Sequence, residues 1–386
     1  MSATSSLRRG SVAIVGAAES QLGLCAPGTT PFDLMAQATH RALKDCGLQL
    51  KDIDGVFTAT TQSRFSSLGL CEYLGLKPRY HDNTQMGGSS FMAHVAHAMA
   101  AINNGLCDVA LIAYGSTQKS VSRAAASPRE YNAYETPYKP FLPTTAYAMA
   151  AARHMYQYGT TREQLAEVAV AARKWALMNP VAWEKKPLTI EEVMNARMVS
   201  SPLTIRDCCL VTDGGGAIIL TSAARAKDLQ KSPAYILGVG EELSHIGISG
   251  MPDLTVSGAA ISGPKAYAMA GITHQEVDLA MLYDAFTINT ILFLEDLGFC
   301  AKGEGGQFVA NGGIAPGGHL AVNTNGGGLS YCHPGMYGLF LLIESVRQLR
   351  GECGERQVAN CEIALAHGNG GVLSSQATVI LGKQAD

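Results

Sequence analysis

The sequence predicts an α/β fold made of two copies of one strand–helix–strand–helix–strand unit. Three segments of the first half recur in the same order in the second half, and short apolar runs typical of buried strands alternate with runs of helical periodicity. Strands that are apolar throughout belong to a sheet covered on both faces, and their alternation with helices is typical of the α/β class. We therefore expect residues 11–116 and 235–382 to superpose.

The first pair of matched segments joins the end of a helix to a buried strand. Gly47 and Gly271 each follow a helical run, where glycine is the preferred residue just past the helix end. A short turn and an apolar strand follow in both copies, with Asp54 and Asp278 at equivalent places. Both pairs are separated by 224 residues, so the spacing supports a duplication.

The second and third pairs of segments extend the repeat. Residues 83–90 and residues 323–330 both begin with Asn-Thr and continue into a glycine-rich turn before an apolar stretch, at a separation of 240 residues. Residues 107–115 and residues 361–368 are apolar strands that end in glycine, near a separation of 254 residues. Three matches in the same order indicate that the whole unit is repeated.

The repeat divides the chain into an N-terminal half, residues 1–226, and a C-terminal half, residues 227–386. Residues 116–202 have no counterpart and contain two helical runs, Thr144–Tyr158 and Arg162–Met178. We interpret this stretch as an inserted loop domain over one end of the sheets. Insertions of this size usually carry binding elements or lids.

Composition limits the classes of protein to consider. The chain has 386 residues, of which 47% are hydrophobic and 16% charged, and its net charge is −3. This balance excludes global disorder, which needs low hydrophobicity and high charge. The absence of long basic runs argues against nucleic acid as a partner.

The cysteines and the apolar runs indicate a cytoplasmic protein. Ten cysteines are scattered without a CxxC pair, and together with the histidines they show no zinc-ligand spacing, so we expect reduced thiols and no metal site. No apolar run approaches the roughly 18 residues of a membrane span. The N-terminal residues do not resemble a signal peptide, and we expect no membrane association.

Five short motifs follow one another in an order that resembles the thiolase superfamily. They lie at residues 211–217, 283–286, 323–328, 332–334 and 367–371. Within the superfamily the chain is most similar to the branch of sterol-carrier-type thiolases and lipid-transfer thiolase-like proteins, which includes acetyl-CoA acetyltransferase-like members. Steroid side-chain retro-aldolases are cousins of this branch.

The resemblance implies a thiolase-like fold with a five-layered αβαβα core, a homodimer, and an active site where the two halves meet. It implies an acyl-coenzyme A thioester as the substrate, with the nucleotide held by the inserted domain and no covalently bound cofactor. Helix N-termini after the glycine-rich turns suit a thioester oxyanion. Members of the branch often work with a small zinc-ribbon/OB-fold protein, and the lack of zinc ligands here fits a partner that supplies that module.

The expected cysteine nucleophile is missing. In standard thiolases it begins the helix after the first glycine-rich turn, and here Gly88 or Ser89 occupies that position, depending on the alignment. Ser89 is a candidate acyl acceptor if a base activates it. The alternative is that Ser89 and Ser90 only cap the helix. Gly88 and Ser90 are also candidates for contacting the substrate or its oxyanion.

A histidine and a cysteine form a second candidate pair. His333 matches the histidine of the Gly-His-Pro motif, which in relatives polarises the thioester oxygen or serves as a base. Pro334 suits the first turn of a helix. Cys332 stands where relatives have glycine, and it is a candidate displaced nucleophile next to His333.

The remaining candidates come from three motifs. His367 lies where many relatives have a second cysteine, and imidazole is a proton carrier of suitable pKa. Tyr283 matches a position that orients water or the substrate oxygen, where a phenol can act as an acid or a donor. Asn325, Gly370 and Gly371 are candidates for binding the substrate or oxyanion. We expect His333, His367 and Tyr283 to line one pocket.

Three functions remain open. The leading interpretation is an acyl-CoA-dependent thiolase-like enzyme, of acyltransferase type, that makes or breaks a C–C bond beside the thioester carbonyl with histidine and tyrosine instead of cysteine. The first alternative is a retro-aldolase that acts on a β-hydroxyacyl-CoA with a zinc-ribbon/OB-fold partner. The second is a subunit that binds a CoA ester or lipid without turnover.

Overall fold

The computed structural model of the chain describes residues 6–122 and 132–385. Residues 1–5 and 123–131, which belong to the predicted N-terminal half, and residue 386 of the predicted C-terminal half lie outside the described residues. Residues 123–131 are also part of the predicted insertion. The predicted boundary after residue 226 lies between strands β7 and β8, and it stays a prediction.

The N-terminal half contributes five strands and three long helices to the core. Its elements are β1 (Val12–Glu19), α1 (Pro31–Cys46), β2 (Gly55–Thr58), α2 (Ser66–Leu74), β3 (Tyr80–Asp82), α3 (Ser90–Asn103), β4 (Val109–Ser116), β7 (Gly214–Ser222) and the short α8 (Ala223–Ala226). Their order in the sheet is β3-β2-β4-β7-β1. The β2 pairings with β3 and β4 are parallel, whereas β7 is antiparallel to β4 and β1.

The C-terminal half repeats this arrangement. Its elements are β8 (Ala234–Leu243), α9 (Ala259–Ala270), β9 (Leu279–Leu282), α10 (Thr287–Asp296), α11 (Gly305–Val309), β10 (Ala321–Val322), α12 (Gly338–Arg350), β11 (Ile363–Gly370) and β12 (Ser375–Gly382). Their order, β10-β9-β11-β12-β8, has the same pattern as in the first half. Asn83 follows β3 and Asn323 follows β10, so the matched glycine-rich turns occupy equivalent places.

The local sequence explains the ends of the helices. Thr30 caps α1 in a capping box with Asp33, and Pro31 occupies the first helical position. Gly47 ends α1 with a φ of 78°, and Gly271 ends α9 with a φ of 65°, a backbone conformation that favours glycine. These equivalent ends confirm the helix–glycine–strand repeat.

The two halves meet along β1 and β8, which pair antiparallel and join all ten strands into one sheet. Helices α3 and α12 pack between the halves and contact strands of both. Helix α1 covers the outer face of the first half and α9 that of the second. The five strands of each half thus lie between an outer helix and the shared pair α3 and α12, which confirms the predicted thiolase-like α/β fold.

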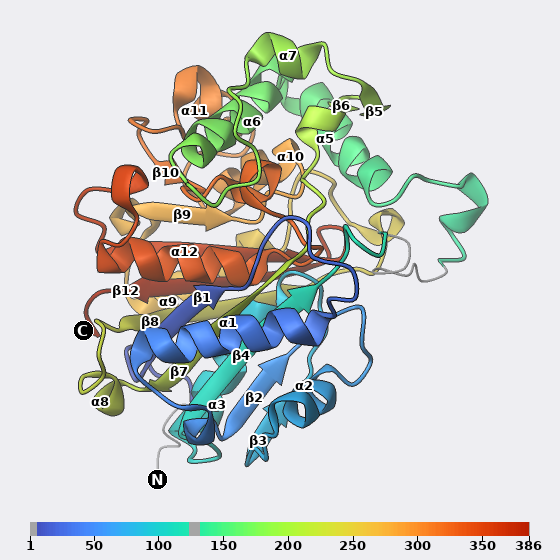
Figure 1. Cartoon of the computed structure of the whole chain (residues 1–386). Coiled ribbons are helices and arrows are strands. Elements are labelled where there is room, and N and C mark those ends of the chain that lie inside the picture. Colours follow the sequence, from blue (N-terminus) through green and yellow to red (C-terminus); the bar gives the residue numbers. More distant parts are fainter. Residues whose placement is uncertain (1–5, 123–131, 386) are drawn as a thin grey trace.

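The predicted insertion lies over one end of the sheets (Figure 1). Its elements are α5 (Thr144–Tyr158), α6 (Arg162–Leu177), α7 (Ile190–Met194) and β5 (Met198–Ser200), and β6 (Leu203–Thr204) follows its predicted end at residue 202 and pairs with β5. Helix α6 packs against α10, α11 and a π-helical turn at Gly327–Tyr331. The insertion therefore touches the segments that carry two of the C-terminal motifs.

The remaining regular structure consists of short 3-10 turns. They lie at Leu50–Asp52, Thr136–Tyr138, Ile205–Asp207, Ile248–Gly250, His274–Glu276, Ala310–Gly312 and Gly354–Arg356. None of the helices within residues 6–122 and 132–385 has the length and apolar character needed to cross a membrane.

Candidate active site

The motif residues gather where the halves meet. Tyr283 follows β9, and His333 lies in the turn before the N-terminus of α12. The glycine-rich turn before α3 packs closely against the end of β11. The approach is so close that a Cβ atom on Gly370 would stand 1.6 Å from the Met86 carbonyl oxygen. Turns from both halves thus form the walls of one site.

Tyr283 and His333 form the polar centre of this site. The Tyr283 hydroxyl lies 3.1 Å from His333 Nε2, and both residues are buried, with exposed fractions of 4% and 6%. Tyr337 stacks over the imidazole, with an interplanar angle of 22° and ring centroids 6.1 Å apart. Burial raises the pKa of Tyr283 well above its ordinary value, although the Tyr337 N–H works in the opposite direction. The phenol is therefore held in its protonated form.

The N-terminal half holds the backbone of His333. Its N–H donates to Thr212 Oγ1 over 3.0 Å, and the Thr212 N–H donates to the His333 carbonyl over 3.3 Å. Thr212 belongs to the motif that leads into β7. One half thus positions the imidazole and the other supplies the phenol.

Gly88 faces the Tyr283 ring. A Cβ atom at Gly88 would stand 2.0 Å from Tyr283 Cε2 and 2.6 Å from the Asn369 carbonyl oxygen. Neither distance is compatible with a side chain, so the tyrosine ring fills the space where a residue at position 88 would place a nucleophile. A cysteine at position 88 and Tyr283 in its observed place exclude each other.

The two serines after Gly88 have structural contacts. Ser89 occupies the N-cap position of α3 but makes no capping hydrogen bond, and its hydroxyl instead donates to the Met86 carbonyl and contacts Ser375 Oγ. The interpretation that Ser89 caps the helix is therefore wrong. Ser90 Oγ accepts from the Met86 N–H over 2.7 Å and closes the glycine-rich turn. Within the described residues no imidazole or carboxylate contacts the Ser89 hydroxyl, so the structure supplies no base to activate it.

Cys332 is fully buried and adopts an extended backbone, with φ −161° and ψ 153°. Neighbouring side chains in extended backbone point to opposite sides, so Cys332 points away from His333. Burial raises the pKa of the thiol well above its ordinary value, and the Glu19 and Asp284 carboxylates raise it further. The structure therefore does not support Cys332 as a nucleophile.

His367 lies on the wrong face of the sheet for the predicted pocket. It pairs with Leu282 in the parallel ladder of β11 and β9, so Gly368 is level with Tyr283. Side chains alternate between faces along a strand, which turns His367 away from Tyr283 and toward Phe293 of α10, with ring centroids 4.6 Å apart. The expectation that His367 shares a pocket with His333 is wrong, because the motif fixes the position of His367 along the chain but not the face of the strand.

The contacts of His367 explain why a polar residue is buried there. Nε2 lies 2.8 Å from Gln376 Oε1, and Nδ1 lies 2.9 Å from Thr378 Oγ1. Gln376 donates to Asn369 Oδ1, and the Asn369 amide donates to the hydroxyl of Tyr147 in the inserted domain. Burial lowers the pKa of His367 to about 4, so the ring is neutral near pH 7. Its place in this hydrogen-bonded chain indicates a structural role.

Asp284 is a functional candidate that sequence reasoning did not single out. Its carboxylate is fully buried and accepts from the N–H groups of Gly328, over 2.6 Å, and Leu329, over 3.3 Å. Burial raises its pKa to about 7, although these two donors act in the opposite direction. Its place directly after Tyr283 was the available signal, but the burial that shifts its pKa depends on the packing of residues 326–329.

Asn325 offers an unused donor beside this centre. Its Oδ1 accepts from the Gly327 N–H and from the Tyr337 hydroxyl, whereas its amide nitrogen is buried and has no hydrogen-bond partner in the described part of the chain. Buried donors without partners are costly and often mark ligand sites. Gly370 ends β11 and Gly371 begins the turn after it, and the Tyr147 hydroxyl donates to the Gly371 carbonyl over 3.2 Å.

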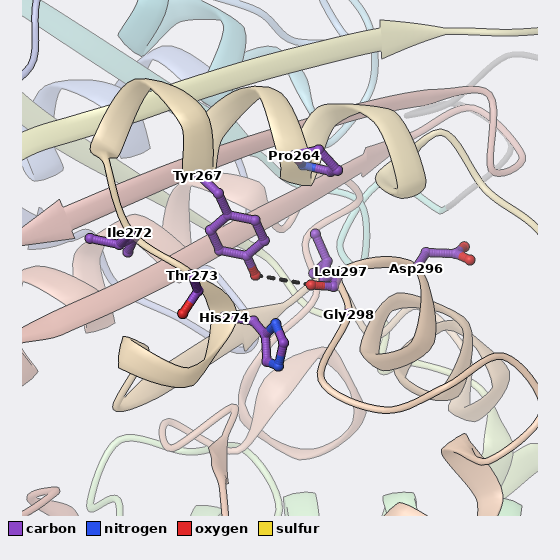
Figure 2. Close-up of a pocket in the computed structure, with 8 residues that line it drawn as sticks. All are labelled: Pro264, Tyr267, Ile272, Thr273, His274, Asp296, Leu297 and Gly298. Carbon is purple, nitrogen blue, oxygen red and sulfur yellow. Dashed lines mark hydrogen bonds between the residues drawn. The ribbon is translucent and has the colours of Figure 1, made fainter.

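A cavity elsewhere in the described residues is separate from this site. A cavity of about 370 Å³ lies between the ends of α9 and α10, where Tyr267 donates to the Leu297 carbonyl (Figure 2), and it shares no lining residue with the site. Within the described ranges, no group of three or more histidine, cysteine, aspartate or glutamate side chains has metal-binding geometry.

Comparisons with known proteins identify the family of this chain. Residues 240–383 match the family of thiolase C-terminal domain-like sequences. The 17-hydroxy-3-oxo-4-pregnene-20-carboxyl-CoA lyase of Mycobacterium tuberculosis is 35% identical over 90% of this chain and 94% of its own length. The acetyl-CoA acetyltransferase of Methanothermobacter thermautotrophicus is 33% identical over 96% of this chain and 99% of its own length.

A solved structure supports the same assignment. The Ltp2-ChsH2(DUF35) aldolase is 30% identical, with a TM-score of 0.88 over 97% of this chain and 98% of that one. The predicted resemblance is confirmed along almost the whole sequence. The chain belongs to the thiolase superfamily, in its branch of sterol-carrier-type thiolases and steroid side-chain aldolases.

Proposed function

We propose that this enzyme cleaves the Cα–Cβ bond of a β-hydroxyacyl-CoA as a retro-aldolase. The observation that carries the proposal is the position of Tyr283. Its ring fills the space beside Gly88, and its hydroxyl lies 3.1 Å from His333 Nε2. This arrangement leaves no room for a side chain at residue 88 and supports an acid–base pair in its place, which is what a retro-aldol reaction requires.

The reaction balances without a covalent intermediate or an oxidant. The β-hydroxyl gives up its proton, the Cα–Cβ electron pair moves onto Cα and the thioester oxygen, and the former Cβ leaves as a ketone or aldehyde. The resulting enolate takes a proton at Cα and becomes a shortened acyl-CoA. We assign proton transfer to Tyr283 and His333, which lie within hydrogen-bond reach of each other.

The developing enolate needs donors, and two groups are suited to this role. The Asn325 amide nitrogen is buried and has no partner within the described ranges of the chain, which favours it as a donor to the thioester oxygen. The second candidate is the backbone at Gly370 and Gly371, whose N–H groups could serve as donors. This segment packs directly against the glycine-rich turn at Met86 and so lies at the site. Asp284, with its pKa of about 7, accepts a hydrogen bond from the Gly328 N–H and so holds the Gly327–Tyr331 turn in place.

Acyl transfer of the thiolase type is the second candidate function. The acetyl-CoA acetyltransferase of Methanothermobacter thermautotrophicus favours it, because that relative is similar over 96% of this chain. This function requires a nucleophile, and Ser89 is then the residue that would carry the acyl group. The contacts of Ser89 with Met86 and Ser375 weigh against it.

We further propose a zinc-ribbon/OB-fold partner, because the similar Ltp2-ChsH2(DUF35) aldolase joins two components. A homodimer and a cytoplasmic location also remain proposals. Copurification with candidate small partner proteins and light scattering of the purified protein test these assembly states.

Incubation with β-hydroxyacyl-CoA esters, with and without the partner, tests the proposed function directly. We expect a carbonyl product and a shortened acyl-CoA in equal amounts, and no acyl group on the denatured protein by intact mass. An acyl adduct on Ser89 would instead establish acyl transfer. Binding of the ester without any product would establish the non-catalytic subunit.

A further inference from the structure

Tyr114 lies near the end of β4 in the N-terminal half, far in sequence from Tyr283 and His333. Its ring is buried, with 1% exposed, and packs on Phe91 with centroids 5.2 Å apart. Its hydroxyl donates to the Pro334 carbonyl and accepts from the Met336 N–H over 3.0 Å. A side chain of one half therefore holds the turn that follows His333.

Tyr283 contacts the same turn in the same way, one residue further on. Its hydroxyl contacts the Gly335 carbonyl at 3.2 Å and accepts from the Tyr337 N–H over 3.1 Å. Two phenols, one from each half, thus hold four consecutive backbone groups. Because Tyr283 also contacts His333 Nε2, the position of this turn sets the geometry of the acid–base pair.

The turn has a shape that depends on these contacts. Gly335 has a φ of 103°, and a Cβ there would stand 2.4 Å from Gln118 Oε1, so glycine is required. Glycine makes the backbone of this turn flexible, so other contacts are needed to hold it in one conformation. Tyr114 holds it at Pro334 and Met336, the residues on either side of Gly335.

We infer that Tyr114 is a positioning residue that fixes the distance between His333 and Tyr283. Thr212 already holds the His333 N–H and carbonyl, and Tyr114 fixes the next carbonyl along the chain. The inference rests on the proposed function for its catalytic consequence, but its geometric content is independent of any substrate. The contacts require only the protonated phenol of Tyr114, and burial raises its pKa above the ordinary value.

The variant Tyr114→Phe keeps the ring on Phe91 and removes both hydrogen bonds. We expect kcat to fall by roughly 10–100-fold with KM changed less than about threefold, because a displacement of about 1 Å in a catalytic pair costs up to 10²-fold. Tyr235→Phe is the matched control, because Tyr235 is a buried tyrosine on β8, 7% exposed, away from the turn. It should leave kcat unchanged. Combined with His333→Ala, the Tyr114→Phe change should add no further loss.

A second measurement separates this inference from the proposed function. In protein labelled at histidine Cε1, the His333 signal should change its chemical shift and its titration midpoint in Tyr114→Phe and not in Tyr235→Phe. This readout works even if no aldol cleavage is found. An unchanged His333 signal, or a loss in the double variant equal to the product of the single losses, would overturn the inference.

A third substitution covers the case in which Tyr114→Phe does not fold. A 4-aminophenylalanine at position 114 retains a donor and acceptor at the ring end, and 4-fluorophenylalanine fills the same space without a donor. We expect the amino variant to keep the wild-type His333 signal and the fluoro variant to lose it. Equal behaviour of the two would contradict the role of the hydroxyl.

Discussion

The two faces of the β9–β11 strand pair carry similar side chains with different roles. On the face toward the other half, Tyr283 contacts His333, and nearby the Asn325 amide nitrogen has no hydrogen-bond partner among residues 6–122 and 132–385. On the opposite face, His367 has both ring nitrogens engaged, by Gln376 and Thr378. A histidine whose ring nitrogens are both hydrogen-bonded inside the protein has a structural role. Polar groups between the two halves that lie beside an unpaired hydrogen-bond donor are instead available to a substrate.

The largest expected difference between the faces is the effect of removing each imidazole. His333→Ala should reduce turnover by about 10²–10⁴-fold, the usual contribution of a general acid–base group. His367→Leu should change turnover per folded molecule by less than about threefold, because the ring does not face the site. Steady-state kinetics on both variants, normalised to folded protein, checks this contrast. Equal losses would contradict the division between the faces.

Filling the space beside Tyr283 should have the next largest effect. Gly88→Ala places a Cβ 2.0 Å from the ring, and such overpacking costs about 1–3 kcal/mol in the free energy of unfolding. It should also displace the hydroxyl from His333 and lower kcat. Urea unfolding and kinetics give the two values.

The double variant Gly88→Ala/Tyr283→Ala is the control for this collision. Removing the ring should restore most of the lost stability, while activity stays low because the phenol is gone. If the single and double variants are equally unstable, the cost at position 88 comes from the Asn369 carbonyl instead.

The sequence predicted the fold well because the fold depends on local patterns that repeat. Glycines at equivalent helix ends and apolar strands in the same order fix the two halves, and the ten-stranded sheet has the expected internal symmetry. The motifs also brought Tyr283 and His333 together correctly. These features are encoded by residues near one another in the chain.

The errors at the site have a different origin. Which face His367 points to depends on its register with Leu282, and a shift of one residue reverses the answer. The contacts of Ser89 depend on Ser375, almost three hundred residues away, and those of Tyr114 on the turn after Pro334. Asp284 acquires its raised pKa only when residues 326–329 pack over it. Long-range packing of this kind leaves no periodic trace in the sequence.

The buried Asp284 should make stability depend on pH. Its folded pKa of about 7 lies above the ordinary value near 3.8, so the folded state binds the proton more tightly than the unfolded state. This stabilising contribution is complete below about pH 4 and is lost as pH rises through about 7, with an upper limit of about 4 kcal/mol.

Asp284→Asn should therefore show a smaller loss of stability than wild type between pH 5 and pH 8. Urea unfolding at a series of pH values measures the free energy of unfolding of both proteins. Taking the difference between them at each pH removes the contribution of the other titrating groups. Parallel curves for the two proteins would mean that Asp284 keeps an ordinary pKa in the folded state.

On the outer face, the effect of His367→Leu should be confined to stability. The substitution leaves Gln376 Oε1 without its partner, whereas Thr378 Oγ1 keeps its contact with Ser262 Oγ, and an unsatisfied buried polar group costs about 1–3 kcal/mol. His81→Leu, at an exposed position on β3, is the control and should change the free energy of unfolding by less than about 0.5 kcal/mol. A neutral His367→Leu would show that the chain from Thr378 to Tyr147 carries no net stability.

Blocking thiols should have the smallest effect of all, because the proposed acid–base mechanism uses no cysteine. Burial raises the pKa of Cys25 to about 11 and that of Cys107 to about 12, and it raises that of Cys332 well above its ordinary value, so these thiols are poor nucleophiles at pH 7.5. The half-exposed Cys208 and Cys209 precede the returning strand, and a small reagent such as methyl methanethiosulfonate limits steric interference there. We expect kcat within about twofold of the untreated enzyme after modification of the accessible thiols, counted by intact mass. The opposite outcome is a rapid loss of activity that acyl-CoA prevents, with the label on Cys332. That result would identify Cys332 as a nucleophile and show that this site works like that of a standard thiolase.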